Sequence, residues 1–116
     1  MILLIDTDIL LRAALFPQGQ AAAALRKAFA APFRPHIRAE ALDELRRRME
    51  EHSPALAEET EAFLASLAEN VTVTPAPEGG VSAPPDDTVN LFLTGDRTLP
   101  FFDDPRALDA EEFLAF

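Results

Sequence analysis

The sequence predicts a single α/β domain, residues 1–116, built around a parallel β-sheet. Residues 1–5 are all apolar, which is typical of a strand that is buried on both faces and lies centrally in a parallel sheet. Stretches with helix and strand patterns then alternate along the chain, which indicates helices that cross over between parallel strands and cover both faces. We therefore expect a sheet of four to five strands.

In the first half of the chain, pairs of helices link one strand to the next. Residues 7–15 predict a short apolar helix that ends before Pro17. Residues 20–30 are rich in alanine and predict a second helix. A brief strand is expected at residues 33–37, and residues 38–50 predict a longer helix with an apolar stripe.

The next helix has a strong predicted start. Ser53 is a favoured capping residue and Pro54 suits the first turn, so we expect a helix that runs to about residue 69. Residues 71–74 are alternating Val and Thr, which favours a strand. Residues 75–87 contain four prolines and two glycines and read as a long loop.

Two further strands and a helix are expected towards the end of the chain. Residues 89–93 predict a strand, and residues 106–108 predict a weaker one. Asp109 is a suitable cap for a final helix with Glu111 and Glu112 in its first turn.

The composition limits the chemistry of the protein. Twenty acidic and ten basic side chains give a formal net charge of −10, which disfavours binding of nucleic acid through a broad basic face. It does not disfavour a nuclease whose acids surround metal ions. Because cysteine is absent, oxygen atoms or His36 and His52 would hold any metal, and oxygen favours Mg²⁺ or Mn²⁺. No apolar run approaches the ~20 residues that cross a bilayer, and no secretory leader is evident, so we expect a cytoplasmic protein.

An acidic residue follows the first strand directly. Asp6 is expected at the carboxyl edge of the sheet, where open α/β folds bind their ligands. The alternative role of Asp6 is to cap the next helix. Asp8 either assists a metal ligand or is simply an acidic residue in the first turn of that helix. Three more acids, Glu44, Asp87 and Asp96, lie near the ends of later elements. This recurrence favours a metal site.

Five short stretches give the chain a family resemblance. They are residues 5–10, 41–45, 85–87, 93–99 and 108–114, and their order from end to end is more selective than any one of them. The chain resembles PIN-domain proteins, in particular the toxins of bacterial toxin–antitoxin pairs. The resemblance implies a three-layer α/β/α fold and an endoribonuclease that depends on Mg²⁺ or Mn²⁺. It also implies an RNA substrate, a cognate antitoxin and a homodimer.

The resemblance assigns roles to individual residues. It implies that Asp6, Glu44, Asp87 and Asp96 bind the metal and act in catalysis. Thr7 and Thr94 are candidates for orienting the carboxylates, although Thr94 also suits a simple turn. Arg97 is placed to contact RNA. Helical periodicity alone would leave Glu44 in solvent, and Asp86 competes with Asp87 as the third acid.

One departure from the family leaves other functions open. PIN domains carry a helix between the third acid and the strand that ends at the fourth, but only eight residues separate Asp87 from Asp96, so this helix is missing here. A PIN fold kept for partner binding without catalysis is therefore one alternative. A haloacid dehalogenase-like phosphatase with Asp6 as nucleophile is another, which the position of the single lysine, Lys27, disfavours.

Overall fold

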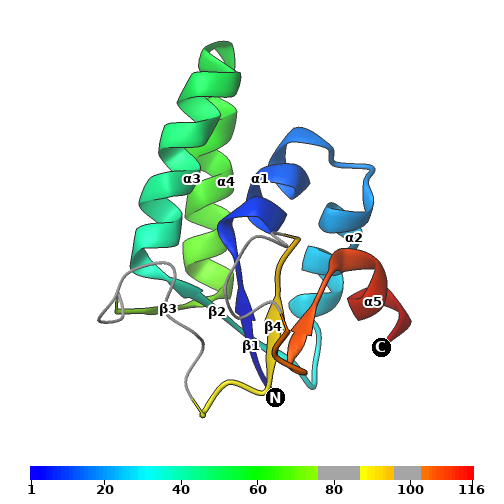
Figure 1. Ribbon diagram of the computed structural model, residues 1–116. Helices are drawn as coiled ribbons and strands as arrows, with labels where there is room; N and C mark the ends of the chain where they lie inside the picture. The colour runs from blue at the N-terminus through cyan, green and yellow to red at the C-terminus, as the bar shows by residue number, and fades with distance from the viewer. Residues whose placement is uncertain (76–86, 96–102) are drawn as a thin grey trace.

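The computed structural model describes residues 1–75, 87–95 and 103–116, which form an α/β fold around one five-stranded sheet (Figure 1). All strand pairs are parallel, and the spatial order is β3-β2-β1-β4-β5. The strands are β1 (Ile2–Ile5), β2 (Arg34–Arg38), β3 (Thr72–Thr74), β4 (Leu91–Leu93) and β5 (Ala107–Leu108). The predicted fold class is confirmed, and β1 lies in the centre, as its apolar run indicated.

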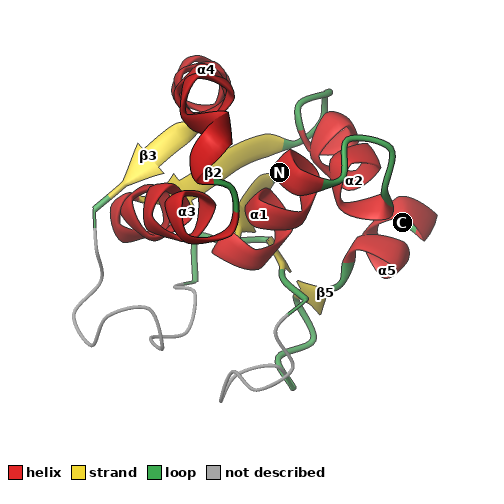
Figure 2. Cartoon of the chain, turned by 90° about the horizontal axis from the view of Figure 1, so that it is seen from above, coloured by secondary structure: helices red, strands yellow, loops and turns green. Residues whose placement is uncertain are grey.

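The helices connect the strands in the predicted order. They are α1 (Thr7–Leu15), α2 (Gln20–Ala28), α3 (Ala39–His52), the 3₁₀ turn η1 (Pro54–Leu56), α4 (Ala57–Asn70) and α5 (Ala110–Ala115). In the view from above, α1 and α3 lie next to each other over the sheet, with α4 beside α3 and α2 beside α1 (Figure 2). None of the helices within the described ranges is long and apolar enough to span a membrane.

Two predicted helix starts have different outcomes. The Ser53 side chain makes no capping hydrogen bond, and the chain passes through η1 before α4 begins, so the prediction of Ser53 as a side-chain cap is wrong. Asp109 does cap α5, because its Oδ1 accepts a hydrogen bond of 2.8 Å from the Glu112 amide. The Glu112 carboxylate in turn accepts one of 3.1 Å from the Asp109 amide. This reciprocal pair is a capping box.

The strands supply a core with two distinct sides. Leu3, Ile5 and Leu93 are fully or almost fully buried and belong to one apolar cluster with residues of the helices. Leu4 and Phe92 are neighbours in the register of β1 and β4, are also buried, and lie outside that cluster. Alternate residues of a strand point to opposite faces, so both faces of the central strands are covered.

The connection into β4 has no helix in its described part. Asp87 and Thr88 form a turn, and β4 begins at Leu91. The absence of a helix between Asp87 and the fourth strand is therefore confirmed for residues 87–90. Residues 76–86 and 96–102 lie outside the described ranges.

Candidate functional site

The register of the two central strands places Asp6 against Thr94. Ile5 pairs with Leu93, and the Asp6 amide donates a hydrogen bond of 2.9 Å to the Leu93 carbonyl. The fully buried Thr94 then donates its hydroxyl to Oδ2 of Asp6 at 2.9 Å. Asp6 stands at the N-cap position of α1, but its side chain makes no capping hydrogen bond. Thr94 therefore holds this carboxylate at the carboxyl edge of the sheet, and helix capping does not.

Gly95, the residue after Thr94, holds the carboxylate of Asp8. The Gly95 amide donates a hydrogen bond of 3.1 Å to Oδ1 of Asp8. The other oxygen, Oδ2, is buried and has no hydrogen-bond partner among the residues that the structure describes. A β-carbon added at Gly95 would lie 2.5 Å from this Oδ2, closer than real β-carbon contacts. Only glycine at this position lets Asp8 approach the backbone so closely.

A small cavity beside Asp6 contains a third acid. Its polar lining is Asp6 between β1 and α1, Thr7 at the start of α1, Arg38 at the end of β2 and Glu40 in the first turn of α3. Phe92 of β4 is one of its apolar lining residues. Its volume is about 10 Å³, roughly the space of one water molecule or one small ion. Both carboxylate oxygens of Glu40 are buried and have no hydrogen-bond partner in the described part of the chain.

The donor atoms at this edge suit a hard divalent cation. Asp8 and Glu40 together present three buried carboxylate oxygens without partners, and burial of a charged oxygen without a partner is costly. Carboxylate oxygens are the ligands that Mg²⁺ and Mn²⁺ prefer. Among the residues that the structure describes, however, no three acidic, histidine or cysteine side chains are grouped closely enough to hold an ion. The described acids have the right chemistry but do not enclose an ion by themselves.

The predicted site residues are not all at this edge. Asp6, Thr7 and Thr94 are there. Glu44 lies one helical turn beyond Glu40 on α3 and pairs with Arg48 at 2.9 Å, with its side chain 23% exposed. It does not line the cavity.

Asp87 lies at the opposite edge of the sheet. It is in the turn before β4, three residues ahead of Asn90, whose Oδ1 accepts a hydrogen bond of 2.7 Å from the amide of Ile2 at the start of β1. The structure therefore does not bring Asp87 to Asp6. The predicted positions Asp96 and Arg97, and the competing Asp86, lie outside the described residues.

Glu40 is an acid that the sequence reasoning missed. Its signal is present in the sequence, because Glu40 follows β2 by two residues much as Asp6 follows β1 by one. The resemblance drew attention to Glu44 instead. The carboxyl ends of adjacent parallel strands meet at one edge, so the position of Glu40 after β2 predicts its approach to Asp6.

The comparisons with known proteins identify the family. The model of the PIN domain matches residues 3–105, so the chain belongs to the PIN-domain family. PIN domains are generally nucleases that use divalent metal ions, act on RNA or DNA and often pair with antitoxins. No curated protein matches the chain. The family match sets the phosphatase alternative aside.

Proposed function

We propose that this protein is a metal-dependent endoribonuclease whose active site is the carboxyl edge around Asp6. The observation that carries the proposal is the pair of contacts from Thr94 and Gly95, which hold the carboxylates of Asp6 and Asp8 at the carboxyl edge of the sheet. Glu40 lies in the cavity next to Asp6 with both oxygens buried. Membership of a family of nucleases supports a hydrolytic role for these acids.

Asp6, Asp8 and Glu40 are the described residues that we propose as contributors to a Mg²⁺ or Mn²⁺ site, and Asp96 would have to complete it because the described acids do not enclose an ion by themselves. A bound divalent ion lowers the pKa of a water molecule and neutralises charge on the scissile phosphate. The chain contributes orientation: Thr94 fixes one oxygen of Asp6, and Thr7 lines the same cavity. Buried apolar neighbours such as Phe92 exclude water around the carboxylates, which strengthens their electrostatic interactions.

The remaining predicted acids have different roles in this proposal. Asp96 stays in the ligand set as a prediction from the resemblance. Glu44 is proposed as an outer acid whose charge Arg48 balances. Asp87 is not included among the proposed metal ligands, because it lies before β4, at the end of the strand away from Asp6. Asp86 stays the alternative candidate for the third acid that the family resemblance implies.

Substitution of the acids tests the proposal. Asp6→Asn and Glu40→Gln should each lower cleavage of single-stranded RNA in Mn²⁺ by at least about 100-fold, because each removes a charged ligand. Asp87→Asn is the matched control, and it should cleave within about threefold of the unmodified protein. EDTA should abolish all cleavage. Ordinary cleavage by the Asp6 variant would refute the mechanism.

A partner-binding protein without catalytic activity is the second candidate. It is favoured by one observation, that the acids in the described part of the chain do not form a closed cluster. If the folded protein cleaves no RNA with either Mg²⁺ or Mn²⁺ over a range of RNA sequences, this second function replaces the first.

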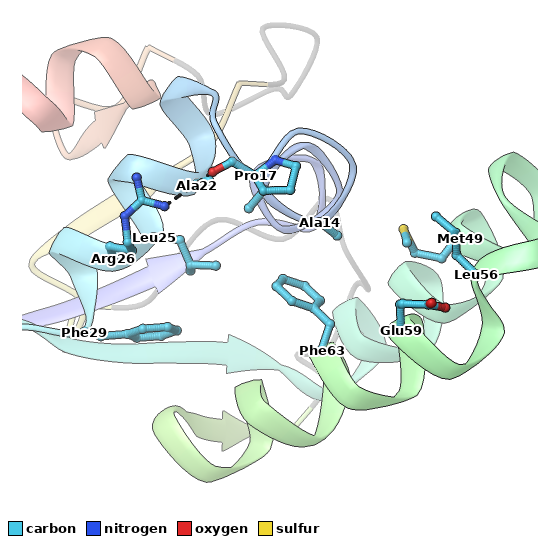
Figure 3. A pocket seen from close by; sticks show the side chains of 11 residues that line it. Ala14, Pro17, Ala22, Leu25, Arg26, Phe29, Met49, Leu56, Glu59 and Phe63 are labelled. Atoms are coloured by element: carbon cyan, nitrogen blue, oxygen red, sulfur yellow. Dashed lines mark hydrogen bonds between the residues drawn. The ribbon is translucent and has the colours of Figure 1, made fainter.

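We further propose that the protein is a cytoplasmic toxin restrained by a basic antitoxin. An apolar groove of about 370 Å³ lies between α1, α2 and α4 and is lined by residues such as Leu25, Phe29, Leu56 and Phe63 (Figure 3). Arg26 and Glu59 stand on opposite sides of it, and the whole chain carries a net charge of −10. This combination suits an amphipathic helix of a basic protein.

Co-expression with the product of the adjacent gene tests the toxin role. The partner should abolish RNA cleavage, and Leu56→Asp should weaken its binding by at least about 10-fold, since Leu56 is 40% exposed at the groove. Val73→Asp is the control, because Val73 is 43% exposed but lies in a different hollow. Light scattering of the isolated protein tests the predicted homodimer.

A further inference from the structure

An arginine stands directly beside the acidic edge. Arg12 lies on α1 one turn after Asp8. A β-carbon added at Gly95 would lie 3.3 Å from Nη1 of Arg12 and 2.5 Å from Oδ2 of Asp8. The side chains of Asp8 and Arg12 therefore both lie next to Gly95, whose amide donates a hydrogen bond to Asp8.

The two charges are close but do not neutralise each other. Asp8 uses Oδ1 for the Gly95 amide, and its Oδ2 is buried without a hydrogen-bond partner. Arg12 is exposed, and across residues 1–75, 87–95 and 103–116 it makes no hydrogen bond or ion pair. Within the described residues its guanidinium thus keeps all five N–H donors available next to the site.

Most other described arginines are already engaged. Arg46 pairs with Glu61, and Arg47 and Arg48 pair with Glu44. Arg106 pairs with Asp104 at 2.7 Å. Arg34 resembles Arg12 in being exposed and without a side-chain partner within the described residues, but it begins β2 and so lies at the amino edge of the sheet.

We propose that Arg12 binds a backbone phosphate of single-stranded RNA next to the phosphate that is cleaved. This inference rests on the proposed nuclease function. A chain with a net charge of −10 repels RNA, so a local cation is needed where the backbone meets the carboxylates. A planar guanidinium suits this task because it grips two phosphate oxygens at once. Its position on α1, fixed relative to Asp8, aligns the strand with the site.

The test compares Arg12→Gln with Arg34→Gln, which remove the same charge from opposite edges of the sheet. Binding of a fluorescent single-stranded RNA is measured by anisotropy in EDTA over a range of NaCl concentrations, and kcat and KM are measured in Mn²⁺. Arg12→Gln should raise Kd about 10-fold, because a charge-assisted contact is lost. It should also reduce the slope of log K against log salt by about 0.7, the value for one phosphate contact with a single strand. KM should rise more than kcat falls, and Arg34→Gln should stay within about twofold of the unmodified protein in Kd.

The outcomes separate this inference from the proposed function. If Arg12→Gln keeps the unmodified Kd and salt slope, or if both arginine variants weaken binding equally, the inference is overturned. Asp6→Asn is measured alongside and should bind RNA with an unchanged salt slope while failing to cleave it. Ordinary cleavage by that variant would overturn the nuclease mechanism, while the anisotropy measurements would still show whether Arg12 contacts phosphate.

Discussion

Replacement of Gly95 by alanine is the sharpest test of the geometry around Asp8. The new β-carbon would lie 2.5 Å from Oδ2 of Asp8, whereas ordinary contacts begin at 3.4 Å. Asp8 must therefore retreat by nearly 1 Å, by the difference between these two distances. Its Oδ2 is buried, so the carboxylate has little free space into which it can move. The hydrogen bond from the Gly95 amide, now 3.1 Å long, would stretch or break.

The expected cost follows from this displacement. Overpacking of one methyl group costs about 1–3 kcal/mol, and a hydrogen bond to a charged group contributes about 1.5–3 kcal/mol. Because part of the strain is relieved when the hydrogen bond breaks, we expect a loss of about 2 kcal/mol in the free energy of unfolding. For a domain of this size that corresponds to a fall of roughly 8 °C in Tm. A shift of about 1 Å in a site residue also predicts a loss of about 100-fold in RNA cleavage.

Urea unfolding and RNA cleavage in Mn²⁺ check the Gly95→Ala variant. Gly19→Ala is the matched control, because the nearest atom to its new β-carbon would be the Phe16 carbonyl oxygen at 3.3 Å. That change should cost less than about 1 kcal/mol and leave cleavage intact. If Gly95→Ala unfolds and cleaves like the unmodified protein, Asp8 is not held over Gly95 and the reasoning about this turn fails.

Two other changes probe a buried hydroxyl and a partly buried ion pair. Thr94→Val removes the hydroxyl that orients Asp6 and should lower the free energy of unfolding in urea by about 2 kcal/mol. Thr60→Val is the control, because the buried Thr60 hydroxyl has no partner within the described residues and its loss should not destabilise the fold. Equal losses in the two variants would contradict this. Hydrogen bonds from Arg106 lower the pKa of Asp104 below its ordinary 3.8. The difference in stability between the unmodified protein and Asp104→Asn should therefore be constant above about pH 5 and shrink below 3.8, as thermal melts across this pH range would show.

Much of the architecture was predictable because it depends on neighbours in the sequence. The apolar run before Asp6 indicates a strand that is buried on both faces and therefore lies centrally in the sheet. Because Asp6 follows this strand directly, it lies at the carboxyl edge. Asp109 and Glu112 form their capping box within one helical turn. Ser53 was less predictable, because the chain after it forms the 3₁₀ turn η1 before α4 begins, and its side chain makes no capping hydrogen bond.

The candidate site was predictable only in part, because the direction of β4 decides which acid reaches Asp6. Asp87 precedes β4 and Thr94 follows it, so a parallel strand carries them to opposite edges. If a helix stood between Asp87 and β4, the connection would be long enough to place Asp87 at the carboxyl edge beside Asp6. The resemblance predicted Asp87 beside Asp6, whereas the structure places Asp87 in the turn that precedes β4.

The sequence by itself determined the α/β class, the central position of β1 and the presence of Asp6 at the edge that binds ligands. These depend on the burial of contiguous apolar residues and on the order of the elements, which are local properties. Only the tertiary structure decided that Thr94 and Gly95 hold Asp6 and Asp8, and that Glu40 lines the adjacent cavity. These contacts join residues as many as 88 positions apart. The order of the elements brings Glu40 to the carboxyl edge, but strand register decides which side chains meet there, and no local pattern specifies those contacts.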